Sequence, residues 1–287
     1  MIKRDSSYTD SRPLLYLVAT PVGNIKDFTY RAIEILSSVD MVACEDTRNT
    51  KKLLSFYDIN KPLFSLHEHN EISASINLIE KIKEGTKVAY VSDAGYPLIS
   101  DPGQLLVKQC IENDVKVSVI PGGNAMLLGL CGSNINTAHF LFYGFLASKP
   151  SERNHQLESL VKVKDTIIFY EAPHRIKETL TAMHKYLGDR QICIARELSK
   201  LHEEYIRMNL SDVDDLDIES LKGEMVITVE GNNLKDEINE DDIRKLINEE
   251  LEKHELKDKE IAKKLSEEHH LAKNYIYDLI LKIKNGN

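Results

Sequence analysis

The chain has 287 residues but no tryptophan, and no apolar run approaches the roughly 20 residues that a membrane-spanning helix needs. Its first residues, MIKRDSSYTDSR, are polar and lack the apolar stretch of a signal peptide. These absences predict a cytoplasmic protein with no membrane contact.

Patterns that would form metal sites or disulfides are also missing. The four cysteines form no CxxC pair and are widely and irregularly spaced, so neither a zinc site nor a disulfide framework is expected. His67 and His69 stand close together in LHEHNE, but no convincing third ligand flanks them. We therefore expect no metal, and buried free thiols in a reducing compartment.

An excess of positive charge is absent as well. The net charge of −9 argues against broad, non-specific binding of nucleic acid, because such binding needs clustered Lys and Arg. A local basic patch is still compatible with this charge. Hydrophobic residues make up 42% of the chain, which is enough for a core and excludes a largely disordered protein.

Several well-known motifs do not occur. There is no GxxxxGK[ST], so P-loop phosphoryl transfer is unsupported. No GxGxxG follows the first predicted strand, which removes the usual fingerprint of dinucleotide-binding proteins and class I methyltransferases. The GxSxG elbow of serine hydrolases is missing too.

What is present is an alternation of strands, loops and helices over the first 120 residues or so. Strands are predicted at 14–19, 39–44, 87–92 and 115–120, and helices at 28–38, 71–83 and 103–112. Asp27 is the expected N-cap of the first helix. The alternation predicts an α/β domain with a mostly parallel sheet, in which ligands bind beyond the carboxyl ends of the strands.

Unusual loops follow these predicted strands. They are TPVGN at 20–24, EDTRNT at 45–50, SDAGYPLISDPG at 92–103 and PGGNA at 121–125. Dense glycine and proline hold a backbone in one shape, so such loops can present N–H and C=O groups to a ligand. Taken singly, each loop is explained equally well as a structural turn.

The chain beyond residue 136 holds a second set of elements. Strands are predicted at 139–145, 166–170, 191–195 and 224–230, with a helix at 173–187. FYEAPHR at 169–175, ARELSK at 195–200 and KGE at 222–224 each place a Glu beside a cation at a strand end. They suggest a cleft lined by both halves, although a structural salt bridge would explain each of them.

The composition shifts again after Gly231, being acidic through 234–256 and mildly basic over 257–287. Helices are predicted at about 258–267 and 272–284, a spacing that resembles a helix-turn-helix; a solvated helical pair packed on the main body is the alternative. The expected organisation is a flexible N-terminus (1–13), two α/β domains (14–135 and 136–232) and a helical tail (233–287).

Seven motifs carry a family resemblance. They occur in the order LYLVATPVGN, ACEDTRNT, LHEHNE, VSDAGYPLISDPG, FYEAPHR, ARELSK and KGEMVITVEG. In this order the chain, from about residue 14 to 231, resembles the bacterial small-subunit rRNA cytidine-2′-O-methyltransferases, a branch of the tetrapyrrole methylase (class III methyltransferase) superfamily.

The resemblance implies a two-domain α/β fold of the class III type with a C-terminal helical appendage. It also implies a homodimer and S-adenosylmethionine bound in the cleft between the domains. By similarity, the cofactor is expected to contact Pro21, Gly23, Ser92, Asp93, Ala94, Gly95, Pro121, Gly122, Tyr170, Ala195 and Leu198.

The same resemblance implies a substrate, the 16S rRNA of the small ribosomal subunit, methylated at the ribose 2′-hydroxyl of a cytidine. The residues expected to face RNA are Glu45, Arg48, Arg175, Arg196 and Lys200. A ribose hydroxyl is a poor nucleophile at neutral pH, so a nearby base should help. The candidates for that role, which the pattern does not rank, are Asp46, Glu171 and Glu197.

The chain departs from the family pattern at several points. Tyr96 stands where the family usually has Thr, Gly123 where it has Pro, and Ala147 where it has Pro. The usual Gly-Leu-Pro before the second domain reads Asn-Ile-Asn at 134–136. These changes concern the cofactor pocket and the domain hinge more than the reaction.

Two rival functions remain at this point. One is a class III methyltransferase that acts on a porphyrin-like ring or a protein side chain, against which the EDTR and FYE motifs favour the rRNA branch. The other is a non-catalytic RNA- or nucleotide-binding regulator with a helix-turn-helix tail.

Overall fold

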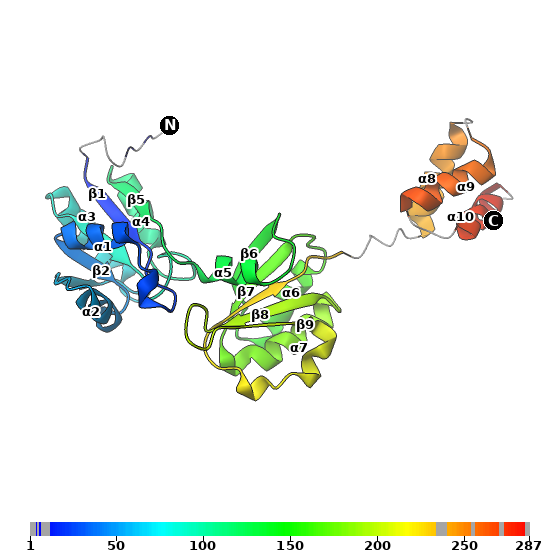
Figure 1. The fold of residues 1–287 in the computed structure, drawn as a ribbon. Helices are drawn as coiled ribbons and strands as arrows, with labels where there is room; N and C mark the ends of the chain where they lie inside the picture. The colour runs from blue at the N-terminus through cyan, green and yellow to red at the C-terminus, as the bar shows by residue number, and fades with distance from the viewer. Residues whose placement is uncertain are drawn as a thin grey trace. The chain divides into compact units, whose positions relative to one another are not determined.

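The structure is a computed structural model that describes residues 4, 6, 12–233, 240–253, 256–269 and 273–284. The expected flexible N-terminus, 1–13, lies largely outside the described residues. Contacts divide the chain into two compact units, Met1–Asn232 and Asn233–Asn287 (Figure 1). None of the described helices is long and apolar enough to cross a membrane.

The first half of the larger unit is a parallel sheet of five strands in the order β3-β2-β4-β1-β5. Its strands are β1 (Leu14–Val18), β2 (Met41–Cys44), β3 (Leu63–Ser65), β4 (Val88–Val91) and β5 (Lys116–Ile120). The helices between them are α1 (Tyr30–Ser38), α2 (Thr47–Phe56), α3 (Glu71–Lys83) and α4 (Gln104–Glu112).

Four of these strands and three of these helices are predicted from the sequence, whereas β3 and α2 are not. Strand β3 has three residues, too few for a period to be visible, and α2 begins inside the polar EDTRNT stretch. The predicted cap at Asp27 is wrong. Asp27 ends a short 3₁₀ turn, and the Thr29 side chain caps α1 by accepting the Ala32 N–H.

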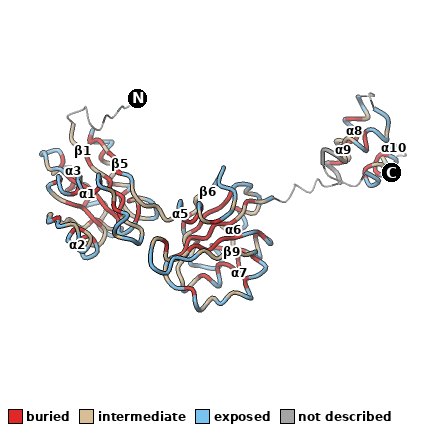
Figure 2. Tube along the Cα trace, in the orientation of Figure 1, coloured by how far each residue is buried: buried red, intermediate tan, exposed pale blue. Residues whose placement is uncertain are grey.

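Helices cover both faces of this sheet, so its strands are mostly apolar and largely buried (Figure 2). Alternate residues such as Leu15 and Tyr90 pack against α3 and α4, while Val42 and Ala89 pack against α1 and α2. Because helices cover both faces of the sheet, ligands are expected to bind at the edge where the parallel strands end.

The second half is a mixed sheet in the order β6-β7-β10-β8-β9. Its strands are β6 (Phe140–Phe145), β7 (Thr166–Glu171), β8 (Gln191–Arg196), β9 (Glu204–Asn209) and β10 (Met225–Val229). Helix α5 (Ala125–Gly132) covers one face, and α6 (Pro150–Leu160) and α7 (Ile176–Leu187) cover the other. Only β6 and β7 pair in parallel; the other pairs are antiparallel.

The register of the central strands decides which residues meet at the sheet edge. Met225, the first residue of β10, pairs with Glu171 at the end of β7 and with Arg196 at the end of β8. The FYE, ARE and KGE stretches are far apart in the sequence, and this antiparallel register brings them together at one edge.

The smaller unit contains α8 (Glu240–Glu252), α9 (Asp258–His269) and α10 (Lys273–Lys284) around a core that includes Ile247, Ile261 and Ile276. Helices α9 and α10 agree with the predicted pair. Helix α8 is not predicted, because its many acidic residues obscure the apolar spacing of Ile243 and Ile247. The residues that join α9 to α10, 270–272, lie outside the described part of the chain.

Candidate functional site

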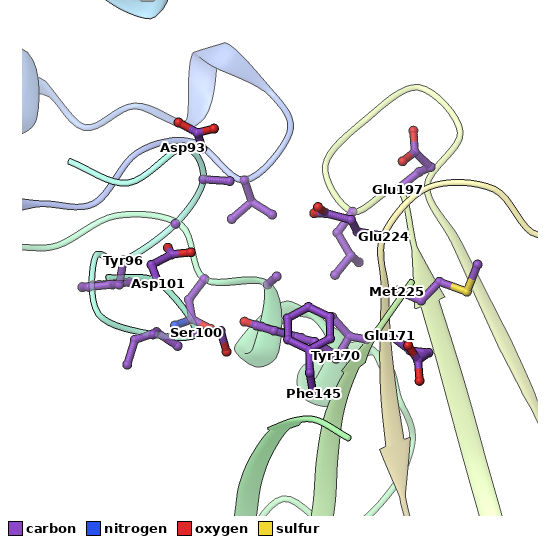
Figure 3. Close-up of a pocket in the computed structure, with 18 of the residues that line it drawn as sticks. Asp93, Tyr96, Ser100, Asp101, Phe145, Tyr170, Glu171, Glu197, Glu224 and Met225 are labelled. Carbon is purple, nitrogen blue, oxygen red and sulfur yellow. The ribbon is translucent and has the colours of Figure 1, made fainter. Parts of the chain in front are cut away.

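A cavity of about 230 Å³ lies within the larger unit and is walled by both of its halves (Figure 3). From the first half come Val22, Asp93, Ala94, Gly95, Tyr96, Ile99, Ser100, Asp101, Asn124 and Ala125. From the second half come Phe145, Tyr170, Glu171, Glu197, Leu198, Lys200, Glu224, Met225 and Val226. The walls are built from the strand-end loops that the sequence singles out.

The TPVGN loop of the first half touches the ARELSK loop of the second. A Cβ on Gly23 would lie 2.5 Å from the Leu198 carbonyl oxygen and 2.7 Å from Lys200 Cγ, so only glycine fits. The Asn24 N–H donates to Ser199 Oγ at 2.9 Å. Among the described wall residues, this loop contributes Val22 but neither Pro21 nor Gly23. Gly23 therefore sets the approach of the two loops.

The SDAG turn after β4 lines part of the cavity. Thr20 and Gly95 exchange backbone hydrogen bonds of 2.8 and 3.1 Å, which ties this turn to the end of β1. Ser92 is buried beneath it, whereas Asp93, Ala94 and Gly95 line the cavity. The predicted cofactor residues of this turn therefore lie together in the structure.

The PGGNA turn after β5 stands beside the SDAG turn. The Gly122 N–H donates to Tyr96 Oη at 3.2 Å. Asn124 caps α5 by accepting the Leu127 N–H and also lines the cavity, as does Ala125. Neither Pro121 nor Gly122 is among the residues that line the cavity.

The second half supplies an aromatic wall. The Tyr170 and Phe145 rings lie 5.5 Å apart between centroids in an edge-on arrangement, and both line the cavity. Burial raises the pKa of the Tyr170 hydroxyl. Leu198 also faces the cavity, whereas Ala195 is buried in β8 opposite Val226 and lies behind the wall.

Asp46 is a helix cap. Its side chain accepts the Arg48 N–H at the start of α2 and pairs with the Arg48 guanidinium at 2.6 Å. Hydrogen bonds from Arg48 lower the pKa of Asp46 to about 2. A carboxylate held this firmly in its ionised form is a weak proton acceptor near neutral pH, which argues against the catalytic role predicted for Asp46.

Glu171 is 1% exposed, and its carboxylate is already occupied. It accepts the Thr179 hydroxyl at 2.5 Å and the Ala172 N–H at 2.8 Å, and Arg175 Nε lies 3.4 Å away. In Figure 3 its carboxylate points away from Asp101. These contacts argue that Glu171 anchors α7 to the end of β7 rather than accepting a substrate proton.

Glu197 adopts a left-handed backbone conformation at φ +50° and pairs with Lys200 at 2.9 Å. This ion pair closes the ARELSK loop upon itself. Two residues predicted to face RNA are likewise paired within the protein. Arg196 binds Glu204 at 2.6 Å, and Arg175 donates to the carbonyls of residues 146 and 147.

Arg48 differs from these cations because its side chain is 85% exposed. Glu45, at the end of β2, is partly buried, and burial followed by the charge of Asp93 raises the pKa of its carboxyl. Arg48 and Glu45 therefore stay predicted RNA contacts. Both follow β2 of the first sheet.

Two cavity carboxylates, Asp101 and Glu224, are not among the sequence candidates. Asp101 belongs to the Asp-Pro-Gly element that ends the SDAGYPLISDPG loop, and burial together with the charge of Glu45 raises its pKa to about 6. Glu224 ends the KGE motif. The motifs provide the signal for both residues, but only folding shows which of their side chains reach the cavity.

No cluster of three or more His, Cys, Asp and Glu side chains within the described ranges is arranged to hold a metal ion. His67 and His69 lie edge-on at 5.9 Å between ring centroids.

The chain matches a known enzyme family over most of its length. The sequence pattern of the family described as Tetrapyrrole (Corrin/Porphyrin) Methylases covers residues 14–214. "Ribosomal RNA small subunit methyltransferase I" of Bacillus subtilis (strain 168) is 47% identical over 245 residues, or 84% of each chain. The protein of the same name from Haemophilus influenzae is 42% identical over 276 residues, covering 94% of this chain and 96% of the relative.

Solved structures share the fold at low sequence identity. A cobalt precorrin-4 methyltransferase superposes with a TM-score of 0.59 at 15% identity, covering 76% of this chain and 94% of the other. Uroporphyrin-III C-methyltransferase from Thermus thermophilus, complexed with S-adenosylhomocysteine, gives 0.55 at 16% identity, covering 77% and 98%. These likenesses bear on the two-sheet architecture alone.

Proposed function

Because this chain belongs to the tetrapyrrole methylase family, we propose that it transfers a methyl group from S-adenosylmethionine to the 2′-hydroxyl of a cytidine ribose in 16S ribosomal RNA. S-adenosylmethionine is the cofactor. The substrate rests on one observation: relatives named ribosomal RNA small subunit methyltransferases share 42–47% of their residues with this chain over 84–96% of their own lengths.

The cavity residues suit this cofactor. Its sulfonium and amino groups are cationic, and the carboxylates of Asp93 and Asp101 line the cavity. The Tyr170 and Phe145 rings offer apolar faces for its uncharged parts. When bound, the cofactor supplies an electrophilic methyl group, so the protein is left to align the reactants and shape the charge around them.

The same carboxylates disfavour RNA phosphates inside the cavity. A ribose is neutral and can enter, while flanking phosphates are better placed near exposed cations such as Arg48. The side chains of this cavity therefore separate a sugar from its charged backbone, and this supports a ribose hydroxyl as the methyl acceptor.

We also propose that the protein is a homodimer that works in the cytoplasm, where ribosomal RNA is found, and that it needs no metal. Large apolar side chains are exposed on β5, α5 and β6, among them Val119, Leu127, Leu128, Phe140 and Leu141. Burying such side chains in a second copy would remove them from water. Light scattering at micromolar concentration that shows a monomer would contradict the dimer.

The direct test compares ribose methylation of ribosomal RNA in cells with and without this protein. We expect one cytidine of 16S rRNA to lose its 2′-O-methyl group when the protein is absent, and to regain it when purified subunits are incubated with the protein and cofactor. Unchanged ribose methylation, or methyl transfer only to a base, a tetrapyrrole or a protein, would overturn the proposal.

A further inference from the structure

At the start of β10, the backbone directs the side chain of Glu224 into the cavity. Glu224 directly precedes Met225, which pairs with Glu171 and Arg196 at the ends of the neighbouring strands. Gly223, at φ +80°, makes the turn before it, and a Cβ there would lie 2.0 Å from Glu197 Oε1. The close packing of this turn against the Glu197 side chain holds Glu224 at the edge of the sheet.

The side chain of Glu224 is directed into the cavity. In Figure 3 its carboxylate extends from the second half toward the side that carries Asp93 and Asp101. Burial is the main cause that raises the pKa of Asp101 and of Tyr170, and the charge of Glu224 adds a smaller contribution to both, so Glu224 lies within electrostatic range of both cavity walls. The residue is exposed, which leaves a path for proton exchange with solvent.

Among the described residues, Glu224 is also the cavity carboxylate whose oxygens have no hydrogen-bond or ion-pair partner. Asp93 accepts from Asn49 Nδ2 at 2.8 Å, and Asp101 accepts from Ser92. Glu171 is held by Thr179 and the Ala172 N–H, and Glu197 by Lys200. Within the described part of the chain, Glu224 makes no hydrogen bond or ion pair, so its oxygens are available to a substrate hydroxyl.

We propose that Glu224 is the proton acceptor for the ribose 2′-hydroxyl, an inference that rests on the proposed function. The hydroxyl donates its proton to a Glu224 carboxylate oxygen. The ribose oxygen uses a lone pair to form the new C–O bond, while the C–S bond breaks and leaves its electron pair on sulfur. The products are the methylated ribose, a neutral thioether and a protonated Glu224, which returns its proton to water.

The test compares full-length wild-type protein with E224Q, E224D and the matched control E178Q, all assayed on purified small ribosomal subunits. Glu178 is an exposed carboxylate on α7 that pairs with Arg153 outside the cavity, so E178Q makes the same chemical change elsewhere. Single-turnover methylation rates are measured near neutral pH. Calorimetry with S-adenosylhomocysteine and thermal melting report cofactor binding and folding.

We expect E224Q to lower the single-turnover rate by about 100-fold or more, the range of a lost general base. E224D should retain part of the rate, and E178Q should match the wild type. Binding of S-adenosylhomocysteine and the melting temperature should stay near wild-type values in all variants.

A rate for E224Q within threefold of the wild type would overturn this inference and leave the proposed function standing. A loss of S-adenosylhomocysteine affinity that accounts for the whole loss of rate would also overturn it, because Glu224 would then act in binding. A wild-type protein that leaves ribose unmethylated would overturn the proposed function and this inference together.

Discussion

The hydroxyl of Tyr96 accepts a hydrogen bond from the Gly122 N–H at 3.2 Å and so joins the turns after β4 and β5. Tyr96 and Gly123 stand where the resembling family usually has threonine and proline. A proline would restrict the PGG turn by itself, whereas here a side chain from the neighbouring turn holds it. The two departures from the family pattern thus meet in one structural feature.

Replacing Tyr96 with Phe should loosen the PGG turn and weaken cofactor binding. The loss of one hydrogen bond of this kind is worth about 0.5–1.5 kcal/mol, or about two- to tenfold in the dissociation constant of S-adenosylhomocysteine measured by calorimetry. Tyr275→Phe, which removes an exposed hydroxyl from α10, is the control. Adding Gly123→Pro to Tyr96→Phe should restore part of the affinity; a double variant no better than the single one would contradict the account.

Replacing Gly23 with Ala should push the two loops apart. The added Cβ would meet a backbone carbonyl at Leu198, which cannot turn aside, so we expect a cost of about 1–3 kcal/mol in unfolding free energy together with weaker cofactor binding. Gly85→Ala is the matched control, because Gly85 has open space around it and a φ of +100°. That variant should lose stability through backbone strain but keep its cofactor affinity. Equal effects of both variants on affinity would refute the role of the Gly23 contact.

The raised pKa of Asp101 makes cofactor binding sensitive to pH. Burial, followed by the charge of Glu45, raises this pKa from 3.8 to about 6. A bound cation favours the ionised carboxylate and lowers the pKa again, so S-adenosylmethionine that binds near pH 6 should release protons. Titrations in buffers with different ionisation enthalpies count these protons. S-adenosylhomocysteine, without the sulfonium charge, should release fewer, and identical proton release by the two ligands would exclude this coupling.

The raised pKa of Asp101 also affects folding stability. Stability falls as the pH rises, which is opposite to the effect of a salt-bridged carboxylate. The folded protein binds the Asp101 proton more tightly than the unfolded chain does, so this stabilising contribution is complete below pH 3.8 and is lost as the pH rises through about 6. Asp101→Asn should therefore raise the melting temperature above pH 6, relative to the wild type, and change it little near pH 4.

The helical tail is expected to assist RNA binding without touching the cofactor. Lys264 pairs with Glu250 at 3.0 Å, and Lys284 pairs with Asp258, so part of the positive charge predicted for this unit is neutralised inside it. Deleting residues 236–287 should weaken binding to small subunits by about tenfold at low salt and reduce its salt dependence. The dissociation constant of S-adenosylhomocysteine should be unchanged. Equal binding of assembled subunits and naked RNA by both proteins would show that the tail has no role in recognition.

Sequence alone located the strand-end loops of the first half, because in a parallel sheet the polar turn that follows each apolar strand must lie at one common edge. The family resemblance named Asp93, Ala94, Gly95, Tyr170 and Leu198 as cofactor contacts, and all five line one cavity. The order of the motifs likewise established the family without any coordinates, and the family pattern covers residues 14–214.

The tertiary structure decided what each charged side chain does, since that depends on partners distant in the sequence. Asp46 caps a helix that its polar stretch does not reveal, and Glu171 is held by Thr179 on the following helix. Glu224 faces the cavity because the antiparallel register of β10 brings its first residues to the ends of β7 and β8. A motif specifies which carboxylates stand near a site, but only the packed chain determines which of them remains unpaired there.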